Sequence, residues 1–248
     1  MTDDALFRAA QRGDLDETRR LLEQMLKQSA PVSVFRQAMR VAIWNDHEDI
    51  VCKIVCLAGH LLRRCDPFQS DTWAVTLAAR LDSTAAANVL IQCSKGTLPG
   101  VPDSHAHNCD FGTAFSCAAD NGNAATLLLL IPHVTSIEWR NAALASAVHI
   151  GHARTIRTLL KCGVNVNARD WFGIPLHTAA LSGQTRVVAQ LLHFKANVHA
   201  RTKYGATALA LANAEGYAST AAVLRRFAGK ATKPGRRKVK ACHLFLRA

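Results

Sequence analysis

Apolar residues return along this chain in one short pattern, about every 30 residues. An apolar residue is followed three and four residues later by two small residues, then by Gly or Asp, and further on by two aliphatic residues. This spacing places the apolar positions on one face of a short helix, and Gly readily adopts the left-handed conformation that ends a helix. The aliphatic pair predicts a second helix packed on the first.

Seven copies of the pattern align on one apolar anchor each. The last three steps between anchors, of 29, 32 and 33 residues, are nearly regular, whereas earlier steps of 36 and 40 residues indicate insertions, including a loop over about residues 92–109. One helix pair cannot bury its apolar face alone, so neighbouring pairs must stack. We therefore expect one elongated domain over residues 1–228 and a flexible basic tail over residues 229–248. The anchors are Leu6, Met39, Val75, Phe115, Leu144, Leu176 and Leu209.

The sixth copy reads Asp170-Trp171-Phe172-Gly173-Ile174-Pro175-Leu176-His177-Thr178-Ala179-Ala180, followed by Gly183. It resembles the ankyrin repeat family, whose phrase DxxGxTPLHxAA it matches except for the Thr before Pro. Residues 163–168 and 195–200 resemble the family's link between repeats, with Lys195 in place of Gly. The resemblance covers about residues 5–227 and is weakest between 56 and 140. It implies an all-α repeat solenoid of about seven stacked helix-turn-helix ankyrin-like repeats with short hairpin loops, irregular in the second to fourth repeats.

Positive charge is concentrated in the second half of the chain. Residues 139–248 hold 18 Lys and Arg against 2 acidic residues, whereas residues 1–138 hold 12 against 16. A positive half attracts acidic proteins, nucleic acid or anionic lipid, although a merely soluble Arg-rich surface would look the same. The tail carries a cluster that resembles a nuclear-import or polyanion-binding motif. Its residues are Lys233, Arg236, Arg237, Lys238 and Lys240.

No pattern in the sequence indicates catalysis, so we expect no enzyme activity and no cofactor. Cys52 and Cys56 share a helix face, and the inserted loop contains His105-x-His107-x-Cys109, but no second pair stands at a zinc-like spacing. We therefore expect no metal. The resemblance implies a structural role for His177, whose ring would hydrogen-bond to backbone between neighbouring repeats.

The sequence predicts no membrane span, because no apolar run approaches the roughly 18 residues needed. The amino terminus is acidic and lacks an apolar signal region. We expect a cytoplasmic monomer, with nuclear localisation or delivery into a host cell as an effector left open.

The resemblance implies partner contacts at the hairpin tips and at the ends of the first helices. The tip positions are Trp171, Phe172, Lys203 and Tyr204, with Phe111 earlier in the chain. The helix-end positions include His149 and Leu181. Arg169 and Arg201 flank the tips. Trp and Tyr dominate interface hot spots. The leading hypothesis is a non-enzymatic protein-protein interaction module, an adaptor, inhibitor or effector, that binds an acidic, partly apolar protein partner through its concave face and tips. Two alternatives remain: the aromatic residues pack sideways between tips, or the basic half and tail serve a nuclear or nucleic-acid-associated regulatory factor.

Overall fold

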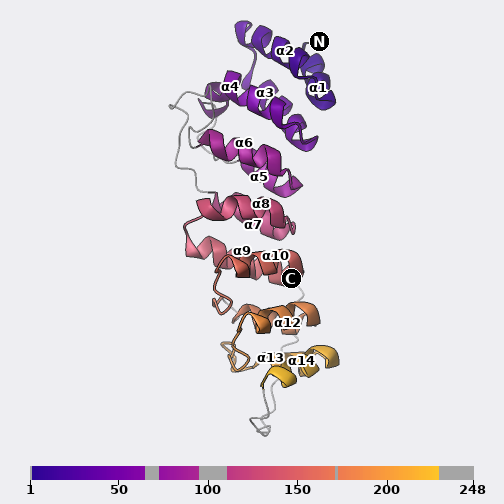
Figure 1. Ribbon diagram of the computed structural model, residues 1–248, viewed down its shortest axis with the longest axis vertical. Coiled ribbons are helices and arrows are strands. Elements are labelled where there is room, and N and C mark those ends of the chain that lie inside the picture. Colours follow the sequence, from indigo (N-terminus) through magenta and orange to yellow (C-terminus); the bar gives the residue numbers. More distant parts are fainter. Residues whose placement is uncertain (1, 65–72, 95–110, 171–172, 229–248) are drawn as a thin grey trace. The chain divides into compact units, whose positions relative to one another are not determined.

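The computed structural model describes residues 2–64, 73–94, 111–170 and 173–228. These residues form fourteen α-helices that alternate as seven pairs joined by tight turns (Figure 1). Apart from an isolated bridge between Arg201 and Thr207, the described residues contain no β-structure. The all-α repeat architecture predicted from the seven anchors is confirmed. By compactness the chain divides into a first unit, residues 1–139, and a second unit, residues 140–248.

The first unit stacks its helix pairs in chain order (Figure 1). Helices α1, α3, α5 and α7 contact one another in succession and form an inner layer, while α2, α4, α6 and α8 form an outer layer in the same way. Its helices are α1 (Thr2–Arg12), α2 (Leu15–Lys27), α3 (Val32–Trp44), α4 (Glu48–Arg64), α5 (Trp73–Leu81), α6 (Thr84–Ser94), α7 (Gly112–Asp120) and α8 (Ala124–Leu130), followed by the 3-10 helix η2 (Ile131–His133).

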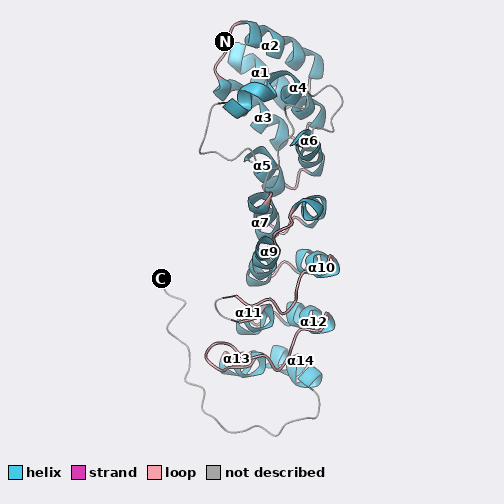
Figure 2. Ribbon diagram, turned by 90° about the vertical axis from the view of Figure 1, so that its left-hand side faces the viewer, coloured by secondary structure: helices cyan, strands magenta, loops and turns pink. Residues whose placement is uncertain are grey.

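The second unit repeats the two-layer arrangement. Helix α9 begins at the end of the first unit and continues into the second. The outer helices α10, α12 and α14 contact one another in succession, and the inner helices α11 and α13 lie side by side (Figure 2). The helices are α9 (Ile137–Ile150), α10 (Ala153–Lys161), α11 (Pro175–Leu181), α12 (Thr185–His193), α13 (Ala208–Ala214) and α14 (Ala218–Ala228).

The anchors and the Ala pairs form the core between the two layers. Six of the seven anchors are at most 3% exposed; Leu209, in the last helix pair, is half-buried. In the sixth repeat Ala179 and Ala180 are fully buried, and their small side chains let α12 approach closely enough to bury Leu191 completely. Burying one such Leu is worth about 1.5–3 kcal/mol. Pro175 stands at the first turn of α11, where a missing N–H costs nothing.

Every inner helix is followed by a residue in the left-handed conformation, as the pattern predicted. Five of these residues are glycines with φ between 66° and 97°, and the other two are Asp46 and Asp82, at 58° and 57°. Asp tolerates this conformation better than most residues because its short polar side chain can hydrogen-bond locally. Here each carboxylate bonds to the next repeat: Ser83 Oγ donates to Asp46, and Thr126 Oγ1 donates to Asp82 at 3.0 Å.

One position of the repeat, eight residues after the anchor, ties successive turns together. A side chain at this position reaches a backbone carbonyl near the end of the preceding inner helix. The pairs are His47 Nε2 with Gln11 O at 3.2 Å, Asn123 Nδ2 with Ala79 O at 2.7 Å, and Gln184 Nε2 with His149 O at 3.1 Å. These bonds occupy carbonyls that a helix terminus leaves without intrahelical partners, and they fix the spacing between repeats within each unit.

Candidate protein-interaction surface

The hairpin between α12 and α13 is a tight turn organised by Thr202, which is only 5% exposed. The Thr202 N–H donates to the Ala206 carbonyl at 2.9 Å, and its Oγ1 accepts from the N–H groups of Ala206 and Tyr204 at 3.2 and 3.3 Å. Gly205, with φ of 79°, supplies the left-handed residue that the turn requires. These bonds hold the tip in one conformation, so its side chains project from a rigid base.

Tyr204 stands on this tip with 57% of its surface exposed. The Lys203 ammonium lies 5.1 Å from the centre of the Tyr204 ring, within the range of a cation–π contact. Arg201 Nη1 donates to the Gly205 carbonyl at 2.8 Å, which holds the guanidinium beside the turn. The tip therefore presents an exposed aromatic ring together with two cations.

The preceding hairpin has a comparable base. The Asp170 carboxylate accepts a hydrogen bond from the Gly173 N–H at 2.8 Å, and the Asp170 N–H donates to the Gly173 carbonyl at 2.9 Å. Arg169 is exposed beside it. Trp171 and Phe172, which were predicted to bind the partner, lie outside the described residues.

The buried ring of His177 joins the sixth repeat to the base of the next hairpin. Its Nδ1 accepts from the Ile174 N–H at 3.1 Å, and its Nε2 lies 2.9 Å from the Ala200 carbonyl. A backbone N–H only donates, so the proton is on Nε2 and the ring is neutral. Burial lowers the pKa of His177; the bond to Ala200 and the Asp170 charge oppose this shift, and Arg169 adds to it. His177 therefore has the structural role that the resemblance implied, since its ring hydrogen-bonds to backbone groups of two neighbouring repeats.

The ends of the inner helices α9 and α11 supply the other predicted contact positions. His149 is exposed, Leu181 is half-buried, and Ile150 beside His149 is 50% exposed. We define the candidate interaction surface as these two helix ends together with the tips. Its described members are His149, Ile150, Arg169, Leu181, Arg201, Lys203 and Tyr204.

The exposure of two aromatic residues, Phe111 and Trp44, was not predicted correctly from the sequence. Phe111, expected at an exposed tip, is 4% exposed because it is the N-cap residue of α7 and its ring meets His133 edge-on at 6.0 Å. Trp44, at the end of α3, was overlooked although it is 68% exposed. It stands two residues before Asp46, as His149 stands two residues before Gly151. The repeat alignment therefore contained the signal that could have identified Trp44.

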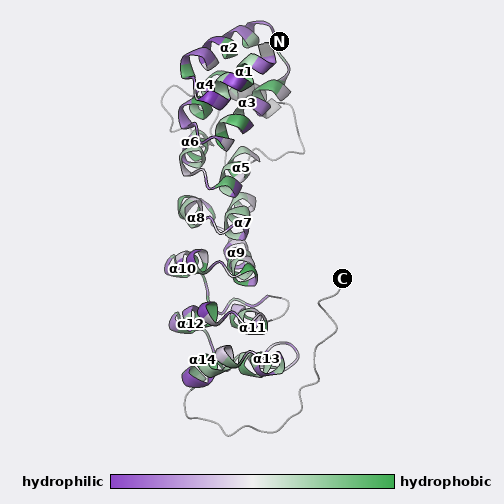
Figure 3. Ribbon diagram, turned by 90° about the vertical axis from the view of Figure 1, so that its right-hand side faces the viewer, coloured by the Kyte–Doolittle hydropathy of each residue, from purple (hydrophilic) through white to green (hydrophobic). Residues whose placement is uncertain are grey.

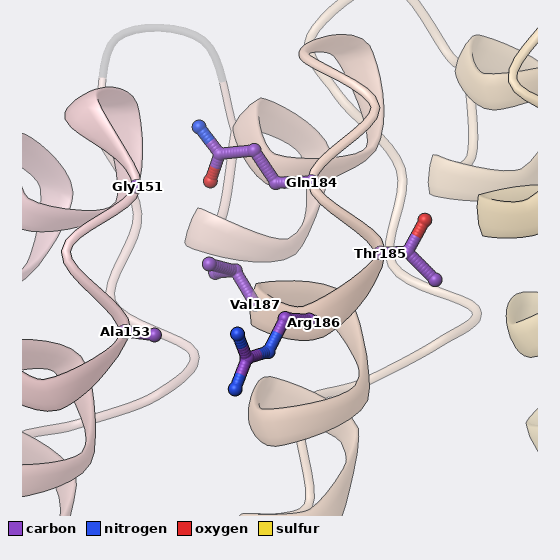
Figure 4. A pocket seen from close by; sticks show the side chains of 6 residues that line it. All are labelled: Gly151, Ala153, Gln184, Thr185, Arg186 and Val187. Carbon is purple, nitrogen blue, oxygen red and sulfur yellow. The ribbon is translucent and has the colours of Figure 1, made fainter.

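A shallow depression of about 330 Å³ lies between the turn that precedes α10 and the start of α12. Gly151 and Ala153 line one side; Gln184, Thr185, Arg186 and Val187 line the other. Figure 4 shows the Gln184 amide and the Arg186 guanidinium on the side of α12 that faces Gly151 and Ala153, while Thr185 points away. Thr185 Oγ1 instead lies 2.8 Å from Thr220 Oγ1. The depression contains no pair of acid and base groups suited to catalysis.

Cysteine and histidine do not converge in the part of the chain that the structure describes. No group of three or more His, Cys, Asp or Glu side chains there is arranged to hold a metal ion. Burial raises the pKa of the Cys52 thiol, Cys56 and Asp49 raise it further, and Lys53 opposes the shift, so the free thiol is mostly protonated at neutral pH. His105, His107 and Cys109 lie outside the described residues. None of the described helices has the length and apolar character of a membrane span.

Comparison with known proteins agrees with this geometry. Residues 139–171 and 174–203 match the family model described as ankyrin repeat. Among solved structures, the chain is similar to the ankyrin repeat domain of Bcl-3, described as a unique member of the IkappaB protein family, with a TM-score of 0.64 and 21% sequence identity over 89% of this chain and 97% of that one. No curated protein sequence matches the chain. The fold is that of an ankyrin repeat domain, and the resemblance to the ankyrin repeat family inferred from the sequence is confirmed.

Proposed function

We propose that this protein is a non-enzymatic protein-protein interaction module that binds an acidic protein segment through the candidate interaction surface. The observation that carries the proposal is the tip of residues 202–206, where a 57% exposed Tyr204 stands on a hydrogen-bonded turn between Lys203 and Arg201. Large aromatic side chains on a rigid base bind at low cost in conformational entropy. The neighbouring cations favour a partner whose contacting segment carries Asp or Glu.

The ends of α9 and α11 extend the same surface with apolar area. Ile150 is 50% exposed and Leu181 is half-buried. A partner segment that anchors an apolar residue there and places carboxylates near the tips would satisfy both parts of the surface. Trp171 and Phe172, which lie outside the described residues, belong to the proposed contacts on the sequence pattern alone. Ankyrin repeats generally act as protein-binding modules, which supports this class of function but does not identify the partner.

The test compares two exposed aromatic residues. Tyr204→Ala removes the ring from the proposed surface, whereas Phe227→Ala removes a ring of similar exposure, 48%, from α14. Proteins captured on the immobilised wild-type chain are compared with those captured on each variant, and binding of a candidate is then measured by calorimetry. We expect Tyr204→Ala to weaken binding by about 1–3 kcal/mol, with binding retained by Phe227→Ala. Equal binding of every captured protein to both variants would refute the assignment.

A further inference from the structure

The outward face of the outer helices in the second unit is basic. Helices α10, α12 and α14 contain no Asp or Glu. On α10, the exposed residues Arg154, Arg157 and Lys161 follow one another at three and four residues, which places them on one face. Of the residues between them, Thr155, Ile156 and Leu159 are fully buried. The basic side chains therefore form the solvent face of this helix.

The next two outer helices continue the face. Arg186 and His193 are exposed at the ends of α12, and Arg226 is exposed near the end of α14. Because the three helices contact one another in succession, Arg154 aligns with Arg186, and Lys161 aligns with His193 and Arg226. Arg154 and Lys161 lie about 10 Å apart along α10, and neighbouring helices pack about 8–10 Å apart. Figure 3 shows hydrophilic stretches on all three helices.

Two of these arginines occupy positions that cost stability. Arg154 and Arg186 are the second residues of their helices, where the helix dipole favours anions over cations. In the first unit the equivalent positions in α2 and α4 hold Asp16 and Asp49. A side chain that breaks a local stability rule without a visible structural return is a mark of function. The change from Asp in the first unit to Arg in the second is therefore not accounted for by helix stability, and we take it as an indication of function.

We propose that the face formed by Arg154, Arg157, Lys161, Arg186 and Arg226 binds the phosphate backbone of a nucleic-acid duplex. It differs from the candidate interaction surface because it is carried by outer helices rather than by tips and inner-helix ends. Five cations spread over three neighbouring helices match a polyanion that presents many phosphates at once. Helices α10 and α12 expose no large apolar side chain of the kind that amphipathic helices insert into a membrane interface. These two helices also expose no Phe, Tyr or Trp ring on which unpaired bases could stack; on α14, Phe227 is 48% exposed.

The proposed contacts determine the salt dependence. Five cations that neutralise about five phosphates give a slope of log K against log salt of about −4.5. Replacing three of them by uncharged residues should reduce the slope by about 2.7, which makes binding about 100-fold weaker at 0.15 M salt. The basic tail adds its own contribution, but this is the same in every variant of the full chain.

The experiment uses the full chain and a fluorescent DNA duplex of about 20 base pairs, titrated at salt concentrations from about 50 to 200 mM. The test variant is Arg154→Gln/Arg157→Gln/Arg186→Gln. The matched control is Arg8→Gln/Arg40→Gln/Arg80→Gln, which removes the same charge from exposed arginines of the first unit. We expect the shallower slope and the 100-fold loss for the test variant alone. Vesicles containing anionic lipid are titrated in parallel.

Two outcomes would overturn the proposal. One is that the test and control variants bind the duplex with the same affinity and slope. The other is that the test variant loses affinity for vesicles but not for the duplex, which would assign the face to a membrane. If the triple variant does not fold, Arg157→Gln alone tests the same point, since one lost phosphate contact should reduce the slope by about 0.9, and an unchanged slope would contradict the proposal.

Discussion

His177 Nε2 lies 2.9 Å from the carbonyl oxygen of Ala200, so one imidazole ring connects the sixth repeat to the hairpin that leads into the seventh. The other ring nitrogen accepts the N–H of Ile174, which is 2% exposed. His177→Ala leaves both backbone groups without partners in a buried site. We expect it to cost about 2–6 kcal/mol, because each of the two orphaned groups costs about 1–3 kcal/mol. Urea unfolding followed by circular dichroism measures the loss; a change below 1 kcal/mol would show that the ring does not join the repeats.

The same ring predicts a pH dependence. Burial lowers the pKa of His177 in the folded chain below its ordinary value of 6.5, so the unfolded chain binds the proton more readily. Stability from this residue is therefore fully present above pH 6.5 and is lost as the pH falls from there toward the lower folded pKa. The difference in unfolding free energy between wild type and His177→Ala should shrink over this range. A difference that grows on acidification would mean that the folded ring binds a proton more tightly than the unfolded one.

Comparing Ala substitutions at two glycines in left-handed turns distinguishes the cost of backbone strain from the cost of a steric clash. Gly183 and Gly216 have φ of 66° and 78°, so Ala at either position costs about 1–2 kcal/mol of strain. A Cβ on Gly183 would also lie 2.6 Å from Tyr217 Cδ1, whereas nothing lies within 4 Å of one on Gly216. We therefore expect Gly183→Ala to destabilise the chain more than Gly216→Ala, in urea unfolding.

The double variant Gly183→Ala/Tyr217→Ala provides the check. Removing the Tyr217 ring should bring the cost of Ala at position 183 down to that of Ala at position 216. If the cost stays the same in the absence of the ring, backbone strain rather than the close approach decides it.

The periodic apolar pattern was sufficient to predict the helix pairs, because burial between stacked helices depends on spacing alone. The left-handed residues were predictable for the same reason, and Asp46 and Asp82 occupy positions where the pattern usually has Gly. The environment of Phe111 was not predictable from the repeat pattern, because its ring contacts His133, which lies 22 residues further on. The exposure of Trp44 was not predicted, because its repeat has Asp46 where the family phrase has Gly and the match there is weak. The basic outer face could be identified only from the solvent exposure of the residues. The sequence alone does not show that Arg154 and Arg186 lie on the same exposed face.

Leu191 tests the assigned register of the sixth repeat. The side chain is fully buried on α12, so Leu191→Ala removes apolar contact and leaves a cavity, at a cost of about 2–5 kcal/mol. Leu128→Ala is the matched control, because Leu128 is 50% exposed on α8 and a surface truncation is worth about 0.5 kcal/mol or less. Both are measured by urea unfolding, and similar costs for the two would show that the aliphatic pair does not face the core.

A substitution at Arg154 should change the stability of the chain and its affinity for a nucleic-acid duplex in opposite directions. Arg154→Glu places an anion in the first turn of α10, where the helix dipole favours it by about 0.3–1 kcal/mol. The new carboxylate also lies three residues before Arg157, close enough for an attraction of about 0.2–0.5 kcal/mol. We therefore expect a higher melting temperature together with weaker duplex binding. Arg157→Glu is the comparison, since its carboxylate lies three residues after Arg154 and four before Lys161 and gains pair attraction, but a mid-helix position gains little from the dipole. It should weaken binding, and its change in melting temperature measures the charge pairs without the helix terminus. A fall in melting temperature for Arg154→Glu would mean that Arg154 stabilises the fold, and the argument from its unfavourable position would no longer hold.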